Sequence, residues 1–197
     1  MPHPLPVKKN AFWWACTALL LLILLSHGAW GEENQTTLVQ DRYGFALSYG
    51  NTFTPDSDIG FWKGTLWAMF DYDKIWGHQA PEALRFKIEL TLGSTTRPDY
   101  KVIASTGMMA LYYLECLSTR FMTPYIEGGI GVIYTDFQVD GQGSRINFNP
   151  QAGFGVEFPL GQETLFTALR WDHISNGGLN KDNQGVDSYV FMIGAYF

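Results

Sequence analysis

The sequence predicts an all-β fold, an eight-stranded antiparallel transmembrane β-barrel of the outer membrane. Three observations favour it: apolar and polar residues alternate over long segments, the composition is unusual, and the chain begins like an exported protein. Charged residues make up 16% of the chain and aromatic residues another 16%, with 21 glycines. Soluble domains are about 25% charged. A soluble β-sandwich also alternates, but it does not need strands as long as those described below.

The N-terminal residues 1–31 are predicted to be a signal peptide that is cleaved, which leaves 32–197 as the barrel domain. Two lysines precede the uncharged apolar run 11–25, and Ala29-Trp30-Gly31 has the small-x-small pattern of a cleavage site. The alternative is an N-terminal membrane anchor. The apolar run is shorter than the roughly 20 residues that a spanning helix needs, which favours cleavage.

Charge and motif content exclude several classes of function. Without Lys8 and Lys9 the chain carries 11 basic and 19 acidic residues, a net charge of −8. This acidic balance argues against a nucleic acid as the partner, which would call for a basic surface. No group of His, Cys and carboxylate residues has metal-ligand spacing, and no glycine-rich phosphate loop precedes a helix. We therefore expect no metal and no cofactor.

Eight segments have the two-residue period of a transmembrane strand, which needs about 9–11 residues. They span residues 41–51, 61–72, 83–93, 101–113, 123–136, 145–158, 163–175 and 187–197. In the third segment apolar residues alternate with Arg85, Lys87, Glu89 and Thr91, and in the sixth they alternate with Asn147, Asn149 and Gln151. The eighth ends on Phe197 and resembles the C-terminal strand of outer-membrane barrel proteins. A closed sheet leaves no edge exposed to lipid.

The connection between the last two strands is predicted to lie at the extracellular end. With an even number of strands both termini share one side, the periplasm in such barrels. This connection begins His173-Ile174-Ser175-Asn176-Gly177-Gly178. His173 and Ser175 are two residues apart, so on a strand they share a face. Asp187 on the next strand has the parity of Tyr189 and Phe191, which marks the same lipid-facing wall.

These residue types suit nucleophilic ester hydrolysis. A serine hydroxyl needs a neighbouring base, here His173, and a carboxylate such as Asp187 orients that base. Asn176 and the N–H groups of Gly177 and Gly178 are candidate oxyanion donors. The alternative is that His173 and Ser175 are ordinary polar residues at a barrel rim. Their position on a face where polar side chains are costly favours a functional site.

The same segment resembles the lipid A 3-O-deacylase family of outer-membrane hydrolases. The shared motif reads His173-Ile174-Ser175-Asn176-Gly177 and then Asn183-Gln184-Gly185-Val186-Asp187-Ser188-Tyr189. Similar stretches begin at Pro124 and Phe148, so the resemblance covers about 124–197. One departure is that a family enzyme carries glutamate at the position of Asp187. Because aspartate is one methylene shorter, it reaches His173 only if the strands approach closely or a water intervenes.

The resemblance implies an eight-stranded barrel that removes the ester-linked 3-hydroxyacyl chain from the 3-position of lipid A. It assigns His173 as base, Ser175 as nucleophile, Asp187 as orienting acid and Asn176 as an oxyanion donor. The partners implied are lipopolysaccharide in the outer leaflet and membrane lipid. Two other functions stay open from the residues alone: a non-catalytic small envelope barrel, and an acyltransferase acting on lipid A. The oligomeric state is not predicted.

Overall fold

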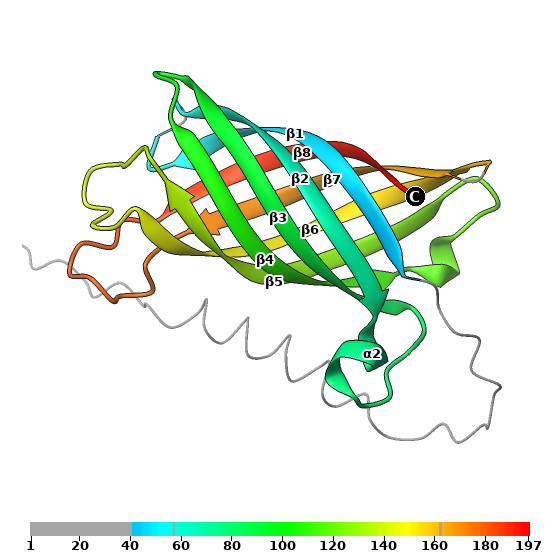
Figure 1. Ribbon diagram of the computed structural model, residues 1–197. Helices are drawn as coiled ribbons and strands as arrows, with labels where there is room; N and C mark the ends of the chain where they lie inside the picture. The colour runs from blue at the N-terminus through cyan, green and yellow to red at the C-terminus, as the bar shows by residue number, and fades with distance from the viewer. Residues whose placement is uncertain (1–40, 57, 162) are drawn as a thin grey trace, which may run out of the picture. The chain divides into compact units, whose positions relative to one another are not determined.

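The computed structural model describes residues 41–56, 58–161 and 163–197, whose strands form a closed antiparallel barrel (Figure 1). The strands are β1 (Arg42–Thr54), β2 (Gly60–Asp71), β3 (Leu84–Arg97), β4 (Val102–Tyr113), β5 (Thr123–Thr135), β6 (Ile146–Leu160), β7 (Glu163–Ile174) and β8 (Val186–Tyr196). Each pairs with the next in the chain, and β8 pairs with β1. The eight predicted strands are confirmed. The predicted signal peptide, residues 1–31, lies outside the described residues.

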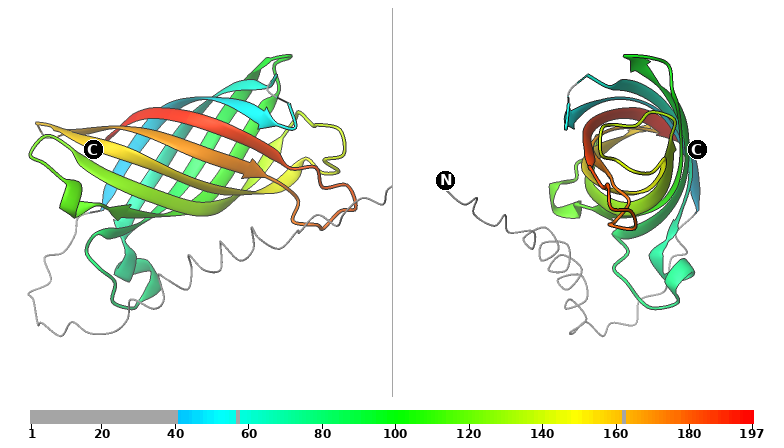
Figure 2. Two further views of the ribbon diagram at one scale, coloured as in Figure 1. Left: turned by 180° about the vertical axis from the view of Figure 1, so that it is seen from behind. Right: turned by 90° about the vertical axis from the view of Figure 1, so that its left-hand side faces the viewer.

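Side chains alternate between the outer wall and the lumen, as the two-residue period predicts. On β3, Ile88, Leu90 and Leu92 point outward and are 44%, 56% and 63% exposed, whereas Lys87 and Glu89 point inward and are buried. A wall of exposed apolar side chains is stable only against lipid, so this surface is typical of a membrane barrel. Figure 2, in its right-hand view, shows the ring of strands nearly end on.

Two short helices occupy connections at the end where β2 and β4 finish. They are α2 (Tyr72–Trp76) and the 3₁₀ turn η1 (Glu115–Leu117). Trp76 of α2 packs edge-on against Phe86 of β3, with 5.6 Å between ring centroids, which is why Phe86 is buried although it shares the outward parity. Among the residues that the structure describes, no helix is long and apolar enough to cross a membrane.

The hairpins β1–β2 and β3–β4 have shorter turns than the gaps 52–60 and 94–100 between the predicted strands. Thr52 and Thr95 each donate a side-chain hydrogen bond to the carbonyl four residues later. The same hydroxyls accept the backbone N–H groups of Ile59 and Lys101 at 3.4 and 2.7 Å. Because these bonds satisfy the backbone of the turn, the strands extend to Thr54 and Arg97.

The β7–β8 connection lies at the opposite end of the barrel from α2 and the C-terminus (Figure 1). It packs against the β5–β6 connection: Gln184 N–H donates to Gly141 O and Asn180 Nδ2 to Gly143 O, both at 2.7 Å. A Cβ atom at Gly143 would lie 2.2 Å from Asp182 O, so the two loops approach as closely as their backbones allow. The loop after His173 is therefore supported by a second loop.

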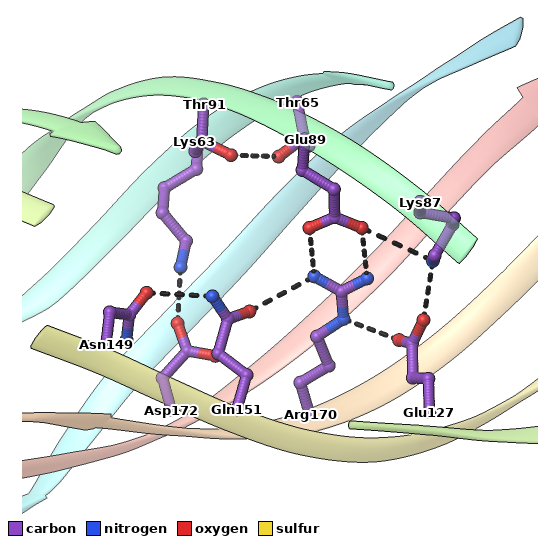
Figure 3. A network of polar contacts seen from close by, with 10 residues as sticks. All are labelled: Lys63, Thr65, Lys87, Glu89, Thr91, Glu127, Asn149, Gln151, Arg170 and Asp172. Carbon is purple, nitrogen blue, oxygen red and sulfur yellow. Dashed lines mark hydrogen bonds and ion pairs between the residues drawn. The ribbon is translucent and has the colours of Figure 1, made fainter. Parts of the chain in front are cut away.

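The lumen contains a charged network that joins three strands (Figure 3). Arg170 of β7 binds Glu89 of β3 at 2.7 and 2.8 Å and Glu127 of β5 at 2.5 Å. Lys87 binds the same two carboxylates at 3.3 and 2.6 Å. Two positive and two negative side chains thus neutralise each other. A buried charge is tolerated when it is paired and hydrogen-bonded in this way.

The lumenal network reaches the backbone behind His173. Arg170 Nη1 donates to Gln151 Oε1 at 3.1 Å, and Gln151 Nε2 donates to Asn149 Oδ1 at 2.8 Å. Asn149 Nδ2 then donates to the carbonyl of His173 at 3.1 Å. Asp172, which precedes His173, points inward to Lys63 Nζ at 2.6 Å, as its parity predicts. Strand β7 is thus held from the lumen while Trp171 and His173 face outward.

Removing Arg170 should destabilise the barrel strongly. The variant Arg170→Met leaves Glu89 and Glu127 buried with one lysine between them, and breaking such a pair costs about 3–5 kcal/mol. Urea unfolding in detergent, followed by heat-modifiable mobility, measures the change in the free energy of unfolding. Arg145→Met is the matched control, since Arg145 pairs with Asp136 at the exposed rim and its loss should change little. Equal effects of the two variants would contradict a stabilising role for the network.

Candidate active site

The side chains of His173 and Asp187 are in direct contact on the outer wall. They are opposite partners in the β7–β8 register, and His173 Nδ1 lies 2.8 Å from Asp187 Oδ1. Their side chains are 23% and 20% exposed. The Cβ atoms of directly opposite residues are only about 4.5–5.5 Å apart. An aspartate therefore reaches the imidazole without a bridging water, because the strands supply the close approach.

Trp171 completes this cluster, and the sequence reasoning did not assign it a role. Its indole Nε1 donates to Asp187 Oδ1 at 3.1 Å, and its ring stacks on the His173 ring with 5.7 Å between centroids and planes 25° apart. The signal was present in the sequence, since Trp171 shares the outward parity of His173. Parity cannot show the diagonal contact with Asp187, which depends on the strand register.

Ser175 follows directly after β7 and stays in extended backbone. It forms an isolated bridge to Phe148 of β6, with Phe148 N–H donating to Ser175 O at 2.8 Å and Ser175 N–H donating to Phe148 O at 3.1 Å. This pairing continues the alternation of β7 by one residue, so Ser175 lies two positions along the face that carries His173. The structure brings His173 and Asp187 into contact and places Ser175 next along the same face.

Asn176 is buried and organises the loop that follows. Its Nδ2 donates to Asp182 O at 2.7 Å and to Gln142 O at 3.2 Å, and its Oδ1 accepts the Gly178 N–H at 3.0 Å. Its own backbone N–H donates to Asn183 Oδ1 at 2.8 Å. Its backbone carbonyl accepts the Leu179 N–H at 3.2 Å, so every polar group of Asn176 is used to fold the loop.

Gly177 and Gly178 give this loop its sharp turn. Their φ angles are +66° and +83°, in the left-handed region that residues other than glycine rarely adopt. Among the described residues the Gly177 N–H has no hydrogen-bond partner, whereas the Gly178 N–H is bonded to Asn176. Of the three candidate oxyanion donors, Gly177 offers the N–H that is available in this conformation.

Gly185 lies against the imidazole of His173. It belongs to the shared motif, but the sequence alone did not indicate a role for it. A Cβ atom placed there would sit 2.7 Å from His173 Cε1 and 3.4 Å from Nε2. No side chain fits between the β7–β8 loop and the ring without moving one of them.

Within the part of the chain that the structure describes, no three His, Cys, Asp or Glu side chains are grouped to hold a metal ion.

The variant Gly185→Ala should therefore reduce any reaction that uses His173 by about 10²-fold, since a shift of about 1 Å at a catalytic group costs that much. Initial rates of ester hydrolysis measure this loss, with heat-modifiable mobility to show folding. Gly64→Ala is the control: its Cβ would lie 3.9 Å from the nearest atom, an ordinary contact far from the site. Unchanged activity of Gly185→Ala would mean that the loop, and not the His173 ring, moves to make room for the added methyl group.

Comparisons with known proteins identify the family and the fold of this chain. The profile of one family, described as lipid A 3-O-deacylase (PagL), matches residues 26–196. A curated relative from Pseudomonas aeruginosa, lipid A deacylase PagL, is 41% identical over 69 residues, a match that spans 34% of this chain and 38% of the relative. Among solved structures, the outer membrane enzyme PagL is 24% identical with a TM-score of 0.53, covering 77% of this chain and 97% of that one. Neisserial surface protein A is 14% identical with a TM-score of 0.60, covering 79% and 95%. These two likenesses show the fold.

Proposed function

Because the chain belongs to the lipid A 3-O-deacylase family, we propose that it is an outer-membrane esterase that hydrolyses the ester-linked 3-hydroxyacyl chain at the 3-position of lipid A. The observation that carries the proposal is the contact between His173 Nδ1 and Asp187 Oδ1 on the lipid-facing wall. Polar side chains are costly on such a wall, and ionisable side chains there indicate a functional site.

In the proposed reaction Ser175 is the nucleophile and His173 the base. The Ser175 hydroxyl attacks the ester carbonyl carbon while an imidazole nitrogen of His173 takes the hydroxyl proton. Since Nδ1 faces Asp187, the nitrogen that serves the serine is Nε2. The Asp187 carboxylate holds the ring in this tautomer and stabilises the imidazolium that forms.

The tetrahedral intermediate then collapses. The bond between the carbonyl carbon and the sugar oxygen breaks, His173 returns its proton to that oxygen, and the acyl group stays on Ser175. Water, deprotonated by His173, attacks the acyl-serine and releases the 3-hydroxy fatty acid with the serine restored. The products are one free fatty acid and lipid A with a hydroxyl at the 3-position.

The oxyanion donors belong to the same proposal. The Gly177 N–H is available, whereas Asn176 and Gly178 would exchange loop hydrogen bonds for bonds to the substrate oxygen. A pre-aimed donor lowers the barrier more than one that must first be released, because it needs no reorganisation. We therefore rank Gly177 first, with Asn176 and Gly178 as the alternatives.

The position of the site suits a substrate that is itself a membrane lipid. The pair lies on the outer wall at the barrel end that carries the β7–β8 connection, so lipopolysaccharide in the outer leaflet would approach sideways. Phe148 is 40% exposed beside Ser175, and Tyr189 is 57% exposed beyond Asp187. Apolar side chains flank the polar cluster, as expected where an ester at the head of an acyl chain must reach the serine.

Mass spectrometry of lipid A tests the function. Purified protein incubated with lipopolysaccharide should release one 3-hydroxy fatty acid and leave lipid A lighter by that acyl group. A mass gain would instead show an acyltransferase, and unchanged lipid A would show a non-catalytic envelope barrel. His173→Ala protein, treated identically, is the control for a contaminating esterase.

We also propose that residues 1–31 are removed on export, which leaves 32–197 as the catalytic barrel domain. Sequencing the N-terminus of protein isolated from outer membranes should then begin at Glu32. A protein that still carries the apolar run 11–25 would show that the segment is an anchor.

A further inference from the structure

We propose that Trp171 is a positioning residue of this esterase: its indole holds the Asp187 carboxylate and the His173 ring in their reactive arrangement. This inference rests on the proposed function, which supplies the reaction that the arrangement serves. It adds a fourth residue to the proposed His173, Ser175 and Asp187, and it assigns that residue a defined contact.

The contact is a shared acceptor. Asp187 Oδ1 accepts hydrogen bonds from both His173 Nδ1, at 2.8 Å, and Trp171 Nε1, at 3.1 Å. With a single partner, a carboxylate on the wall of a barrel can rotate about its side-chain bonds. Two donors that converge on one oxygen from different residues fix its position, and hydrogen bonds to a charged acceptor are the stronger kind.

The strand register explains how the indole reaches this oxygen. Trp171 is directly opposite Tyr189, and His173 is directly opposite Asp187, so Trp171 and Asp187 are diagonal neighbours across β7 and β8. Diagonal pairs are about 7–8 Å apart, within reach of aromatic and other long side chains. Tryptophan combines this reach with an N–H that donates and cannot accept, which is what a carboxylate requires.

The same ring also limits the motion of the imidazole. Trp171 stacks on His173 with 5.7 Å between centroids, and the backbone at Gly185 approaches the Cε1 edge of the ring. With Nδ1 bonded to Asp187, the imidazole is restrained on three sides. Such restraint matters for catalysis because reacting groups must stay close to the productive geometry.

The competing explanation is that Trp171 only anchors the barrel at the membrane interface, since Trp is common where barrel walls meet the lipid head groups. Trp62 of β2 represents that role: it is 55% exposed on the outer wall and packs against the Tyr49 ring at 5.0 Å. Trp62→Phe is therefore the matched control for Trp171→Phe. Both variants keep an aromatic ring and remove one indole N–H.

The first measurement is steady-state deacylation of lipid A by the wild type and the two variants. Trp171→Phe should lower kcat about tenfold, the effect of one hydrogen bond to a charged group, with KM within about twofold. Trp62→Phe should leave both constants unchanged. A wild-type kcat for Trp171→Phe would overturn the proposal.

The second measurement follows the indole N–H resonances of ¹⁵N-labelled protein in detergent micelles. The peak that Trp171→Phe removes should shift when Asp187→Asn replaces the charged acceptor, and the Trp62 peak should stay in place. No shift at the Trp171 peak would show that the indole does not bind Asp187, whatever the rates. This readout needs no activity, so wild-type protein that leaves lipid A intact would refute the proposed function and not this contact.

Discussion

Ser175→Ala should abolish release of the 3-hydroxy fatty acid while the barrel still folds. Without the hydroxyl no acyl-enzyme can form, and losing a triad member costs about 10⁶-fold in kcat in a well-studied serine protease. The fold should tolerate the change because the bonds that hold Ser175 to Phe148 are made by backbone atoms. Mass spectrometry of lipid A after long incubation, beside heat-modifiable mobility on a gel, measures both expectations.

Ser188→Ala is the matched control for this variant. Ser188 lies one residue after Asp187, but it is buried on the lumenal side of β8, so its loss should leave the rate unchanged. The double variant of His173 and Ser175 should be no slower than the worse single variant, because the pair acts as a unit. Full activity of correctly inserted Ser175→Ala protein would remove the serine from the mechanism.

Asp187→Asn should slow hydrolysis by up to about four decades, because an amide holds the wrong tautomer of the base and cannot stabilise the imidazolium. The contact at 2.8 Å makes Asp187 the direct partner of His173, so no other acid can take over without moving the ring. Single-turnover rates on one lipid A substrate compare the variant with the wild type. A nearly neutral effect would mean that no orienting carboxylate is needed or that it lies elsewhere.

Two further variants sharpen this test. Asp187→Glu should keep measurable activity, because the resemblance described above places a glutamate at this position in a family enzyme. Asp182→Asn should be close to wild type, since Asp182 is an exposed loop residue and offers Asn176 only its backbone carbonyl. Loss of activity in Asp182→Asn with a neutral Asp187→Asn would transfer the orienting role to Asp182.

The wall-and-lumen pattern of the barrel could be predicted from local sequence because its physical cause is local. A strand alternates its side chains by geometry, and a bilayer demands an apolar outer face, so residues such as Leu90 and Glu89 are assigned to opposite faces without knowledge of their partners. The same parity placed Asp172 in the lumen, away from its neighbour His173, where it pairs with Lys63. Strand ends were less predictable, since β3 extends to Arg97 through hydrogen bonds that Thr95 makes across the turn.

The candidate site also has a part that the sequence predicts and a part that only the structure shows. Parity and spacing placed His173, Ser175 and Asp187 on one face, and the structure adds the contact between the histidine and the aspartate. Parity could not identify the partners of Asn176, whose amide bonds reach Gln142 in another loop. The roles of Trp171 and Gly185 could not be predicted either, because their contacts with the site depend on the strand register and on the path of the loop.

The sequence by itself thus determined the eight strands, the face that each side chain occupies and the residue types of the site that we propose to be a serine esterase. These depend on the two-residue period and on what lipid tolerates, both of which act on each segment separately. Only the tertiary structure decided that Asp187 touches His173 directly, that Trp171 shares its oxygen, and that the lumenal network reaches the backbone of β7. Those contacts depend on register between strands and on barrel closure, which bring together residues far apart in the chain.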